Sequence, residues 1–380
     1  MRIILSGGGT GGHIYPAVTI AKALEERLAE RGESCEILFI GTKRGLESNI
    51  IPQEGYELAT IEVAGFERRL SLHNLTVAAK AMYSVVAAAK LIRRFGADMI
   101  IGTGGYVCGP VLLAGALLQK PTLIQEQNVV GGVTNKILSR FVDRVAVGYE
   151  EAAASFNHSS KVFVTGNPIR PNVLTADREA AYRSLGLDPQ KKTILVSGGS
   201  RGARTINLAV LALHEALQHD KDKQILHVTG QSEYNNIAGI LAEKGIGTEG
   251  TGNIKVVPYL HNMPEALACA DLAIFRAGAI GLAELTAKGI PAILVPYPYA
   301  AENHQEFNAR ILEKRGAAVV IRDKELSGEK LLKAVDALFA EPNKLALMAQ
   351  KSKELGRPQA AYVIADEALQ LTGRGRNGSK

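Results

Sequence analysis

Short apolar runs alternate along the chain with longer stretches in which apolar residues recur at helical spacing. In the first half the apolar runs are residues 3–5, 36–40, 99–101, 121–124, 144–147 and 162–165. In the second half they are residues 193–196, 224–228, 254–257, 272–275, 292–295 and 317–321. In the stretches between these runs, the helical spacing of apolar residues predicts helices over residues 17–31, 77–95, 205–217 and 280–288. This alternation is typical of parallel, doubly wound α/β sheets.

Each half of the chain opens with the same local pattern, an apolar run that stops at Ser-Gly and is followed by a helix-compatible stretch. The two turns are residues 6–13, SGGGTGGH, and residues 197–204, SGGSRGAR. The unpaired N–H groups and the positive dipole end of such a helix start favour an anion. The repeat predicts a cleft between two α/β lobes that binds one large phosphorylated molecule, or two ligands that must meet.

The length of 380 residues exceeds what one hydrophobic core usually supports, so we expect two domains. The best boundary is residues 166–171, GNPIRP, whose glycine and prolines interrupt helices and strands. We predict an N-terminal domain over residues 1–165 and a C-terminal domain over 166–345. A helical segment over 346–372 is expected to pack back on the N-terminal domain, and the tail over 373–380 to be disordered.

The composition of the chain limits the classes of molecule that it can be expected to bind. The net charge is +6, but the chain has no Trp, few aromatic residues and no nucleic-acid motif, which argues against nucleic acid as a partner. An anionic membrane surface or a phosphorylated substrate fits this charge. The cysteines Cys35, Cys108 and Cys269 form no zinc pattern, so we expect a reduced, cytoplasmic chain. No leader and no apolar run long enough for a membrane span are seen, so we expect a protein that is neither exported nor embedded.

The first glycine turn formally matches the dinucleotide-binding fingerprint at Gly7, Gly9 and Gly12. That mechanism also requires an acidic residue at the end of the second strand to hold the ribose. Residues 40–44, IGTKR, contain none, which weakens the case for a nicotinamide oxidoreductase. Neither turn continues into Gly-Lys-Ser/Thr, which excludes a P-loop. The remaining interpretation is a phosphate or sugar site.

His13 stands where this turn meets the following helix, and Pro16 suits the first turn of that helix. The positive end of a helix dipole disfavours the imidazolium, so the ring stays neutral and able to accept a proton near neutral pH. We therefore predict a general base, against the alternative of a capping or core histidine.

Further polar clusters follow the predicted strands in both halves, where open α/β sheets bind their ligands. The first-half motifs are residues 8–13 with 16–17, 104–107 with 109–110, and 126–128 with 134–135. The second-half motifs are residues 166–170, 198–203, 276–279 with Glu284, and 303–305. In this order and spacing they resemble the MurG glycosyltransferases, which add N-acetylglucosamine to the lipid-linked muramyl-pentapeptide precursor of the bacterial cell wall.

The resemblance implies an α/β protein of the GT-B fold, with the lipid acceptor in the N-terminal lobe and the donor UDP-N-acetylglucosamine in the C-terminal lobe. It implies that His13, with help from Glu126, is catalytic. The implied donor-binding residues are Thr10, Gly11, Gly12, Asn128, Arg170, Ser200, Ala279, Glu284 and Gln305, with His304 and Asn303 beside the sugar. The implied acceptor-binding residues are Gly104, Tyr106 and Asn135. From the residues alone, Glu284 could equally be a surface residue of an amphipathic helix.

The implied reaction is an inverting displacement in which the 4-hydroxyl of the acceptor attacks the anomeric carbon and UDP leaves. Arg170 and a helix end would stabilise the leaving diphosphate. No Asp-x-Asp sequence follows a strand, so we expect no required metal, and the resemblance implies no cofactor.

The family works at the inner face of the bacterial cell membrane, and residues 66–95 mix basic and apolar side chains in a way that suits an anionic bilayer surface. The alternative is a core helix whose lysines face solvent. Other cell-wall synthesis proteins are further partners that the resemblance raises.

Three positions depart from the family pattern: Phe275, Gln125 and Glu302 stand where Ser, His and Asp are expected. They affect the expected fine geometry more than the expected reaction. Two other hypotheses stay open beside the oxidoreductase: another GT-B transferase with a lipid or small-molecule acceptor, and a non-catalytic membrane-associated binding protein.

Overall fold

Seven parallel strands form the first sheet, in the order β3-β2-β1-β4-β5-β6-β7. The structure is a computed structural model that describes residues 1–63, 73–157, 159–199, 202–248 and 252–376. The strands are β1 (Arg2–Gly7), β2 (Glu36–Gly41), β3 (Glu57–Thr60), β4 (Met99–Gly104), β5 (Thr122–Glu126), β6 (Arg144–Val147) and β7 (Val162–Val164). The helices are α1 (Gly11–Glu30), α2 (Glu47–Gln53), α3 (His73–Phe95), α4 (Cys108–Leu117), α5 (Val133–Leu138) and α15 (Ala360–Arg376), with short 3-10 turns at Glu150–Ser155 and Ser159–Lys161.

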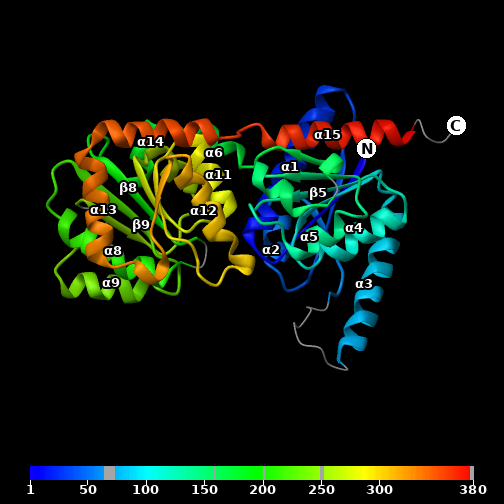
Figure 1. The fold of residues 1–380 in the computed structure, drawn as a ribbon, viewed down its shortest axis with the longest axis horizontal. Coiled ribbons are helices and arrows are strands. Elements are labelled where there is room, and N and C mark those ends of the chain that lie inside the picture. Colours follow the sequence, from blue (N-terminus) through cyan, green and yellow to red (C-terminus); the bar gives the residue numbers. More distant parts are fainter. Residues whose placement is uncertain (64–72, 158, 200–201, 249–251, 377–380) are drawn as a thin grey trace. The chain divides into compact units, whose positions relative to one another are not determined.

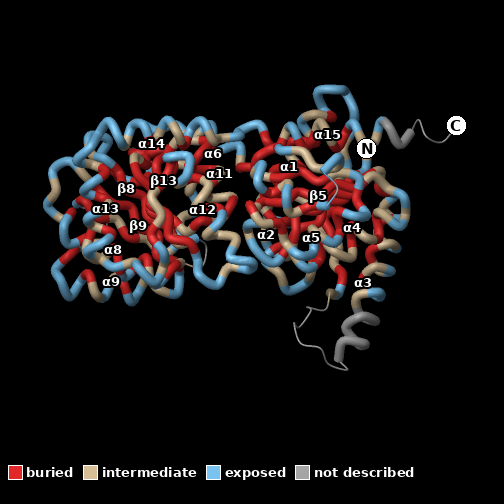
Figure 2. The backbone as a smooth tube through the Cα atoms, in the orientation of Figure 1, coloured by how far each residue is buried: buried red, intermediate tan, exposed pale blue. Residues whose placement is uncertain are grey.

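Helices cover both faces of this sheet, and side chains that alternate along each strand are therefore buried on both sides. In β1, Ile3 and Leu5 face a core formed with α1 and α15, whereas Ile4 faces a core formed with α3 and α4. Figure 2 shows the resulting layers, a buried sheet between helices with exposed outer surfaces. Burial on both faces explains why the strands of this unit appear in the sequence as short, nearly continuous apolar runs.

Six parallel strands form the second sheet, in the order β10-β9-β8-β11-β12-β13. The strands are β8 (Lys192–Ser197), β9 (Lys223–Val228), β10 (Ile254–Val257), β11 (Leu272–Phe275), β12 (Ala292–Leu294) and β13 (Ala318–Val320). The helices are α6 (Pro171–Thr175), α7 (Arg178–Leu185), α8 (Arg204–Leu217), α9 (Tyr234–Glu243), α10 (Met263–Cys269), α11 (Ala279–Lys288), α12 (His304–Lys314), α13 (Gly328–Ala340) and α14 (Pro342–Leu355), with 3-10 turns at Ala301–Asn303 and Asp323–Glu325. Side chains of α8 and α13 fill one core of this unit against β8 and β11.

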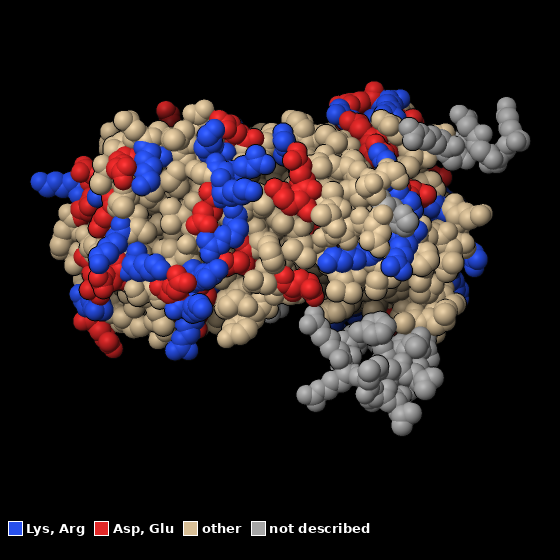
Figure 3. Space-filling view, in the orientation of Figure 1, with Lys and Arg blue, Asp and Glu red and all other residues tan. Residues whose placement is uncertain are grey.

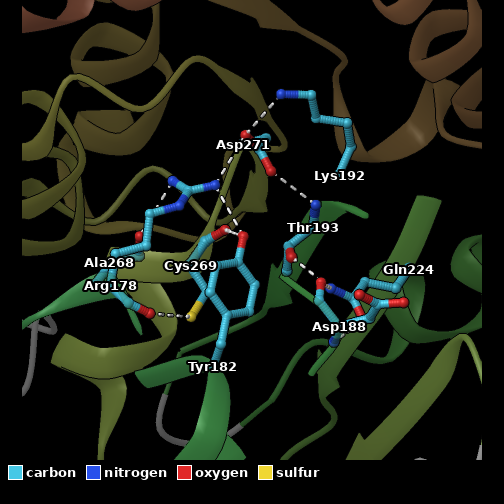
Figure 4. A network of polar contacts seen from close by, with 9 residues as sticks. All are labelled: Arg178, Tyr182, Asp188, Lys192, Thr193, Gln224, Ala268, Cys269 and Asp271. Atoms are coloured by element: carbon cyan, nitrogen blue, oxygen red, sulfur yellow. Dashed lines mark hydrogen bonds and ion pairs between the residues drawn. The ribbon is translucent and has the colours of Figure 1, made fainter. Parts of the chain in front are cut away.

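Asp271 organises the edge of the second sheet at which β8 and β11 begin (Figure 4). Its carboxylate accepts from Thr193 N–H at 2.9 Å, from Arg178 at 3.1 Å and from Lys192 at 3.4 Å. The Arg178 guanidinium also donates to Ala268 O, and Tyr182 Oη donates to Cys269 O, each at 3.3 Å, which fixes α7 to this edge. The second glycine turn follows β8 at the opposite edge of the sheet.

The predicted α/β class and parallel sheets are confirmed, and each apolar run predicted as a strand forms one within three residues of its predicted ends. The sequence interpretation missed β3. That strand lies at the edge of its sheet, begins with the exposed Glu57 and has only half-buried residues after it, so it carries no apolar run.

The chain divides into one unit made of Met1–Ile169 and the residues from Pro358 onward, and a second unit made of Arg170–Arg357. The crossover back to the first unit therefore comes at 357/358 rather than at the predicted 345/346, because α14 packs against α11 of the second unit. The return itself is made by α15, which packs on α1 and forms the ion pairs Arg27–Asp366 and Arg144–Glu367 (Figure 1).

Helix α15 runs to Arg376, where disorder was predicted from residue 373, and residues 377–380 lie outside the described part. Among the described residues, no helix combines the length and the apolar character needed to cross a membrane.

Candidate active site

The first glycine turn lies at the carboxyl edge of the seven-stranded sheet, between β1 and α1. Gly8 N–H donates to Gly104 O at 3.2 Å, so the turn is bonded to the loop that follows β4. A Cβ atom on Gly105 would lie 2.3 Å from Gly8 O, and Gly105 has a φ of +88°. Glycine is therefore required for these two loops to approach each other this closely.

His13 lies in the first turn of α1 and is partly buried. Its Nδ1 atom is 3.1 Å from Gly8 O and 3.4 Å from Thr10 Oγ1. A carbonyl oxygen can only accept, so the contact with Gly8 assigns the proton to Nδ1 and the lone pair to Nε2. Thr103 Oγ1 donates to His13 O at 2.7 Å and ties the helix start to β4. The ring is thus held in the tautomer that accepts a proton at Nε2.

Glu126 ends β5 and is buried, with both carboxylate oxygens engaged by the loop that follows it. One oxygen accepts from Asn128 N–H at 3.0 Å and from Asn128 Nδ2 at 3.2 Å. The other accepts from Gly132 N–H at 2.9 Å and from Asn135 Nδ2 at 2.8 Å. This carboxylate therefore shapes the 128–135 loop, and it binds two of the predicted site residues, Asn128 and Asn135.

Four of the residues predicted to bind the donor or the acceptor, Thr10, Gly11, Gly12 and Gly104, lie beside His13. Gly104 is so close that a Cβ atom on it would be 2.8 Å from His13 Cδ2, and Gly104 has a φ of +109°. Thr10 and Gly12 are exposed at the start of α1, and Gly11 is partly exposed. Tyr106 is 72% exposed, which leaves its ring available to a ligand.

Arg170 and Glu284 form a shielded ion pair within the second unit. The guanidinium Nε and Nη2 atoms each lie 3.0 Å from Glu284 Oε1. Glu284 is on α11 and only 6% exposed, so the alternative of an ordinary surface residue is wrong. Burial raises the pKa of Glu284, and the Arg170 guanidinium opposes that shift. The second carboxylate oxygen can accept a further donor, such as a sugar hydroxyl.

The residues predicted to lie beside the donor sugar, 303–305, are at the start of α12. Glu302 and Asn303 both have a φ of +52°, so the chain turns sharply before His304 begins the helix. His304 Nδ1 lies 2.7 Å from Ala301 O, which fixes the ring. Gln305 Oε1 accepts from Tyr297 N–H at 3.0 Å, so its amide group lies at the loop that follows β12.

The second glycine turn lies between β8 and α8. A Cβ atom on Gly202 would lie 2.1 Å from Thr229 O, and Gly202 has a φ of +75°, so this position also needs glycine. The predicted donor residue Ser200 lies outside the described residues. Ala279 is buried at the start of α11, the helix that carries Glu284.

Two of the three positions that depart from the family pattern, Gln125 and Phe275, have buried side chains. Gln125 Nε2 donates to Asn167 Oδ1 at 3.0 Å, and Asn167 Nδ2 donates to Gln127 O at 2.9 Å, in a fully buried network behind the β4 loop. Phe275 is buried at the end of β11. Glu302 is exposed, and the structure shows no partner that would explain it.

Sequence reasoning missed Glu47, which is only 1% exposed and lies beneath the first glycine turn. Its carboxylate accepts from Gly9 N–H at 2.9 Å, from Thr42 N–H at 3.1 Å and from Thr42 Oγ1 at 2.7 Å. Glu47 lies three residues beyond residues 40–44, the segment at the end of the second strand in which an acidic residue was expected for a dinucleotide site. The available signal was a carboxylate among the glycines at 41 and 45.

No cluster of three or more His, Cys, Asp or Glu side chains in the described ranges could hold a metal ion. The polar groups at both sheet edges are donors and single carboxylates, which suit hydroxyl and phosphate groups.

Comparison with known proteins agrees with this architecture. Models of the N-terminal and C-terminal domains of glycosyltransferase family 28 match residues 3–147 and 193–364. The transferase named UDP-N-acetylglucosamine--N-acetylmuramyl-(pentapeptide) pyrophosphoryl-undecaprenol N-acetylglucosamine transferase is 48% identical in Desulforamulus reducens, over 95% of this chain and 96% of the relative. The protein of the same name in Halothermothrix orenii is 49% identical, over 96% of this chain and 97% of the relative.

Solved structures give the same result. A crystal structure of MurG from Acinetobacter baumannii aligns with a TM-score of 0.73 at 28% identity, over 97% of this chain and 99% of that one. A UDP-GlcNAc 2-epimerase from Neisseria meningitidis, at 13% identity and a TM-score of 0.69 over 97% and 100% of the chains, shares the fold. Two α/β units, each with a glycine turn at the carboxyl edge of a parallel sheet, define a GT-B type of protein. The chain belongs to glycosyltransferase family 28 and, within it, to the MurG family.

Proposed function

We propose that this protein transfers N-acetylglucosamine from UDP-N-acetylglucosamine to the lipid-linked N-acetylmuramyl-pentapeptide, as the names of its relatives describe. The observation that carries the chemistry is the tautomer of His13, whose Nδ1 proton is bonded to Gly8 O so that Nε2 can act as a base. The near full-length match to these transferases supports the choice of both substrates.

The proposed step is a displacement with inversion. The acceptor 4-hydroxyl oxygen bonds to the anomeric carbon of the donor while the bond from that carbon to the UDP oxygen breaks. The hydroxyl proton passes to His13 Nε2 and later to solvent, and UDP leaves as an anion. The chain's own contribution is a base of fixed tautomer and a set of donors for the leaving diphosphate.

Donor binding falls to the second unit. We assign Glu284 to the ribose hydroxyls, because its buried carboxylate has Arg170 on one oxygen and can accept hydroxyl donors on the other. Gln305, with His304 and Asn303, faces the sugar in this proposal. We assign the diphosphate to Arg170 and to the turn that contains Ser200. The start of α11 at Ala279 is assigned to the uracil ring of the donor.

The role of Glu126 changes from the one implied by the resemblance. Four hydrogen bonds already engage its two oxygens, so a proton taken up there would break part of the loop. We assign Glu126 to positioning Asn128 and Asn135, and leave proton uptake to His13 alone.

The membrane-facing surface belongs to the first unit. On α3, Met82, Tyr83 and Val86 are exposed, and on and after α5 so are Val133, Ile137 and Phe141. Figure 3 shows Lys and Arg side chains over α4 and α5 beside uncharged surface. Large exposed apolar side chains beside basic ones suit an anionic bilayer surface. We propose peripheral binding to the cytoplasmic face of the membrane. Arg68, Arg69 and Lys80, which were part of the predicted patch, lie outside the described side chains.

Vesicle binding tests this surface. The exposed Lys90, Arg93 and Arg94 near the end of α3 are replaced together by Glu, which reverses their attraction to anionic lipid. We expect weaker co-sedimentation with phosphatidylglycerol vesicles and unchanged UDP-N-acetylglucosamine binding. Unchanged sedimentation would remove this end of α3 from the proposed surface.

The reaction is tested by following transfer of radiolabelled N-acetylglucosamine from its UDP donor to a short-chain analogue of the lipid-linked acceptor, with EDTA present. We expect product from the wild type, and roughly 10²- to 10⁴-fold less from His13→Ala, the usual contribution of a general base. A folded wild type that binds the donor but makes no product would point to another GT-B transferase with a different acceptor.

A further inference from the structure

Glu47 and His13 are bonded to the two sides of one peptide group. The Gly8 carbonyl oxygen lies 3.1 Å from His13 Nδ1, and the N–H of the next residue, Gly9, donates to Glu47 Oε2 at 2.9 Å. The carbonyl and this N–H belong to the single amide that joins Gly8 to Gly9. The structure therefore connects the imidazole to a buried carboxylate through one amide.

An amide whose N–H donates to a carboxylate is polarised, and its carbonyl oxygen becomes a stronger acceptor. The imidazole N–H on that carbonyl is then held more firmly, and the positive charge that forms when Nε2 takes a proton is stabilised. A carboxylate that contacts a catalytic histidine directly has the same two effects.

We propose that Glu47 is a positioning residue for His13, acting through the 8–9 peptide group to fix the imidazole tautomer and to increase the basicity of Nε2. This proposal rests on the proposed role of His13 as the base. We call this connection from Glu47 through the 8–9 peptide group to His13 the relay, although no proton moves along it. The acceptor's proton stops on Nε2, while the Nδ1 proton and the Gly9 amide proton stay where they are.

The surroundings of Glu47 are arranged for a carboxylate. Cβ atoms on Gly8, Gly41 and Gly45 would lie 2.7, 2.7 and 2.0 Å from its side chain, so the chain has glycine at each of the three places where it would collide. Burial alone would raise the pKa of Glu47, but the hydrogen bonds from Gly9 N–H and Thr42 outweigh burial and lower the pKa. The group is therefore ionised at neutral pH despite being buried.

Other ionisable groups near the turn do not take this role. Burial raises the pKa of the Cys108 thiol to about 12. Lys43, Arg44 and Tyr106 are exposed on the loops after β2 and β4, and Tyr15 lies further along α1. The Glu126 carboxylate at the end of β5 is engaged by its own loop.

The test compares Glu47→Gln with wild type in transfer assays across pH. The charge of Glu47 favours the imidazolium, so its removal lowers the pKa of His13. We expect the acid limb of kcat/KM to move down by about one pH unit. We expect the plateau kcat to fall roughly 10- to 100-fold, the range for carboxylates that orient metal-bound histidines. The KM for UDP-N-acetylglucosamine should stay unchanged.

A matched control removes the carboxylate of Glu54, which follows the opposite end of α2. Glu54 pairs with Lys22 at 2.6 Å rather than with the glycine turn, so Glu54→Gln should keep the wild-type pH profile. If Glu47→Gln retains the wild-type acid limb and kcat while His13→Ala abolishes transfer, the relay is wrong and the base stands. If His13→Ala retains transfer, the proposed base fails first, whatever Glu47→Gln does.

A second variant covers the case in which Glu47→Gln does not fold. Thr42→Val keeps the carboxylate and both backbone donors but removes the 2.7 Å hydroxyl bond. The carboxylate is then less neutralised, so the acid limb should stay in place or move up. A downward shift would contradict the proposal. In both variants, ¹⁵N NMR of the histidine rings reports the tautomer of His13 independently of activity, and in wild type we expect the proton on Nδ1.

Discussion

The two glycine turns begin with the same three residues, yet the first glycine of positive φ in each, Gly9 or Gly199, donates its N–H to a different kind of group. In the first turn Gly9 N–H donates to the buried Glu47 carboxylate, which lies 38 residues further along the chain. In the second turn Gly199 N–H donates at 3.3 Å to the neutral hydroxyl of Ser197, two residues away. The first turn has an anion of its own and presents a histidine. The second has a neutral partner, which suits a turn that receives an anion from a ligand.

The comparison teaches that a glycine-rich strand–turn–helix sequence specifies donors but not their partner. A phosphate was the expected partner in both halves. Whether the anion comes from the protein or from a substrate depends on residues that the local sequence does not contain.

Substitutions at the close-approach glycines should separate the two turns most clearly, with the largest effect at Gly105→Ala. The new Cβ would meet Gly8 O, part of the peptide group that orients His13, in a backbone of positive φ. Displacing a catalytic group by about 1 Å can cost roughly 10²-fold, so we expect a kcat loss of that order. Donor affinity, measured by calorimetry with UDP-N-acetylglucosamine, should be unchanged.

The reciprocal variant is Gly202→Ala in the second turn. Its Cβ would meet Thr229 O, and a strained backbone of this kind costs about 1–3 kcal/mol. We expect weaker donor binding and an unchanged acid limb of the pH profile. Equal effects of both variants on donor binding and on the pH profile would show that the two turns share one role.

Acid should destabilise the second unit through two buried histidines behind its turn. His227 Nε2 lies 3.0 Å from Asn207 Oδ1, and Asn207 Nδ2 donates to Thr229 O, the carbonyl beside Gly202. The rings of His214 and His227 lie tilted against each other, with their centroids 5.2 Å apart. Burial lowers the pKa of His214 to about 4; burial and the neighbouring His214 lower the pKa of His227 well below its usual value.

The sign follows from proton uptake. The unfolded chain protonates its histidines as the pH falls below about 6.5, whereas folded His214 does not until about pH 4. The contribution of neutral His214 to the free energy of unfolding is therefore fully present above about pH 6.5. It is lost as the pH falls from about 6.5 to about 4, by up to roughly 3 kcal/mol. Hydrogen exchange should show α8 and β9 opening more readily at pH 4.5 than at pH 7. His214→Phe should reduce this dependence, and an identical dependence in that variant would exclude His214 as its source.

A smaller effect is expected from Glu284→Gln. The amide keeps the shape of the side chain and can still accept from Arg170, but the charge that pairs with the guanidinium is lost. We expect the KM for UDP-N-acetylglucosamine to rise roughly tenfold with little change in kcat, as for one weakened charged hydrogen bond. A change in kcat alone, with donor KM intact, would place Glu284 outside the ribose site.

The smallest effect is expected at Gly9→Ala. Gly9 has a φ of +83°, but a Cβ atom there would have no neighbour within 4 Å, so only the backbone preference opposes the substitution. Its cost should be about 1 kcal/mol of unfolding free energy in a denaturant titration, with the Glu47 contact preserved. A large loss of activity would mean that the outer face of this turn must contact a ligand closely.

Much of the fold was predictable, because a strand buried on both faces must be apolar throughout and a helix packed on a sheet must be apolar on one side. The half-buried edge strand β3 has neither property, and it was missed. The position of His13 in the first turn of a helix could be predicted, because it depends on the glycine turn beside it. The hydrogen bonds of Glu126 to its own loop could not be predicted, because they depend on four donors whose directions only the folded loop supplies.

The sequence by itself determined the parallel α/β class, the two glycine turns, the placement of His13 at a helix start and the family. Local spacing and residue type carry this information. The tertiary structure alone decided that α14 packs in the second unit while α15 returns to α1, that Arg170 pairs with Glu284, and that Glu47 lies under the first turn. Each is a contact between residues distant in the chain, and such contacts depend on how the strands are ordered in the sheet, which no local pattern encodes.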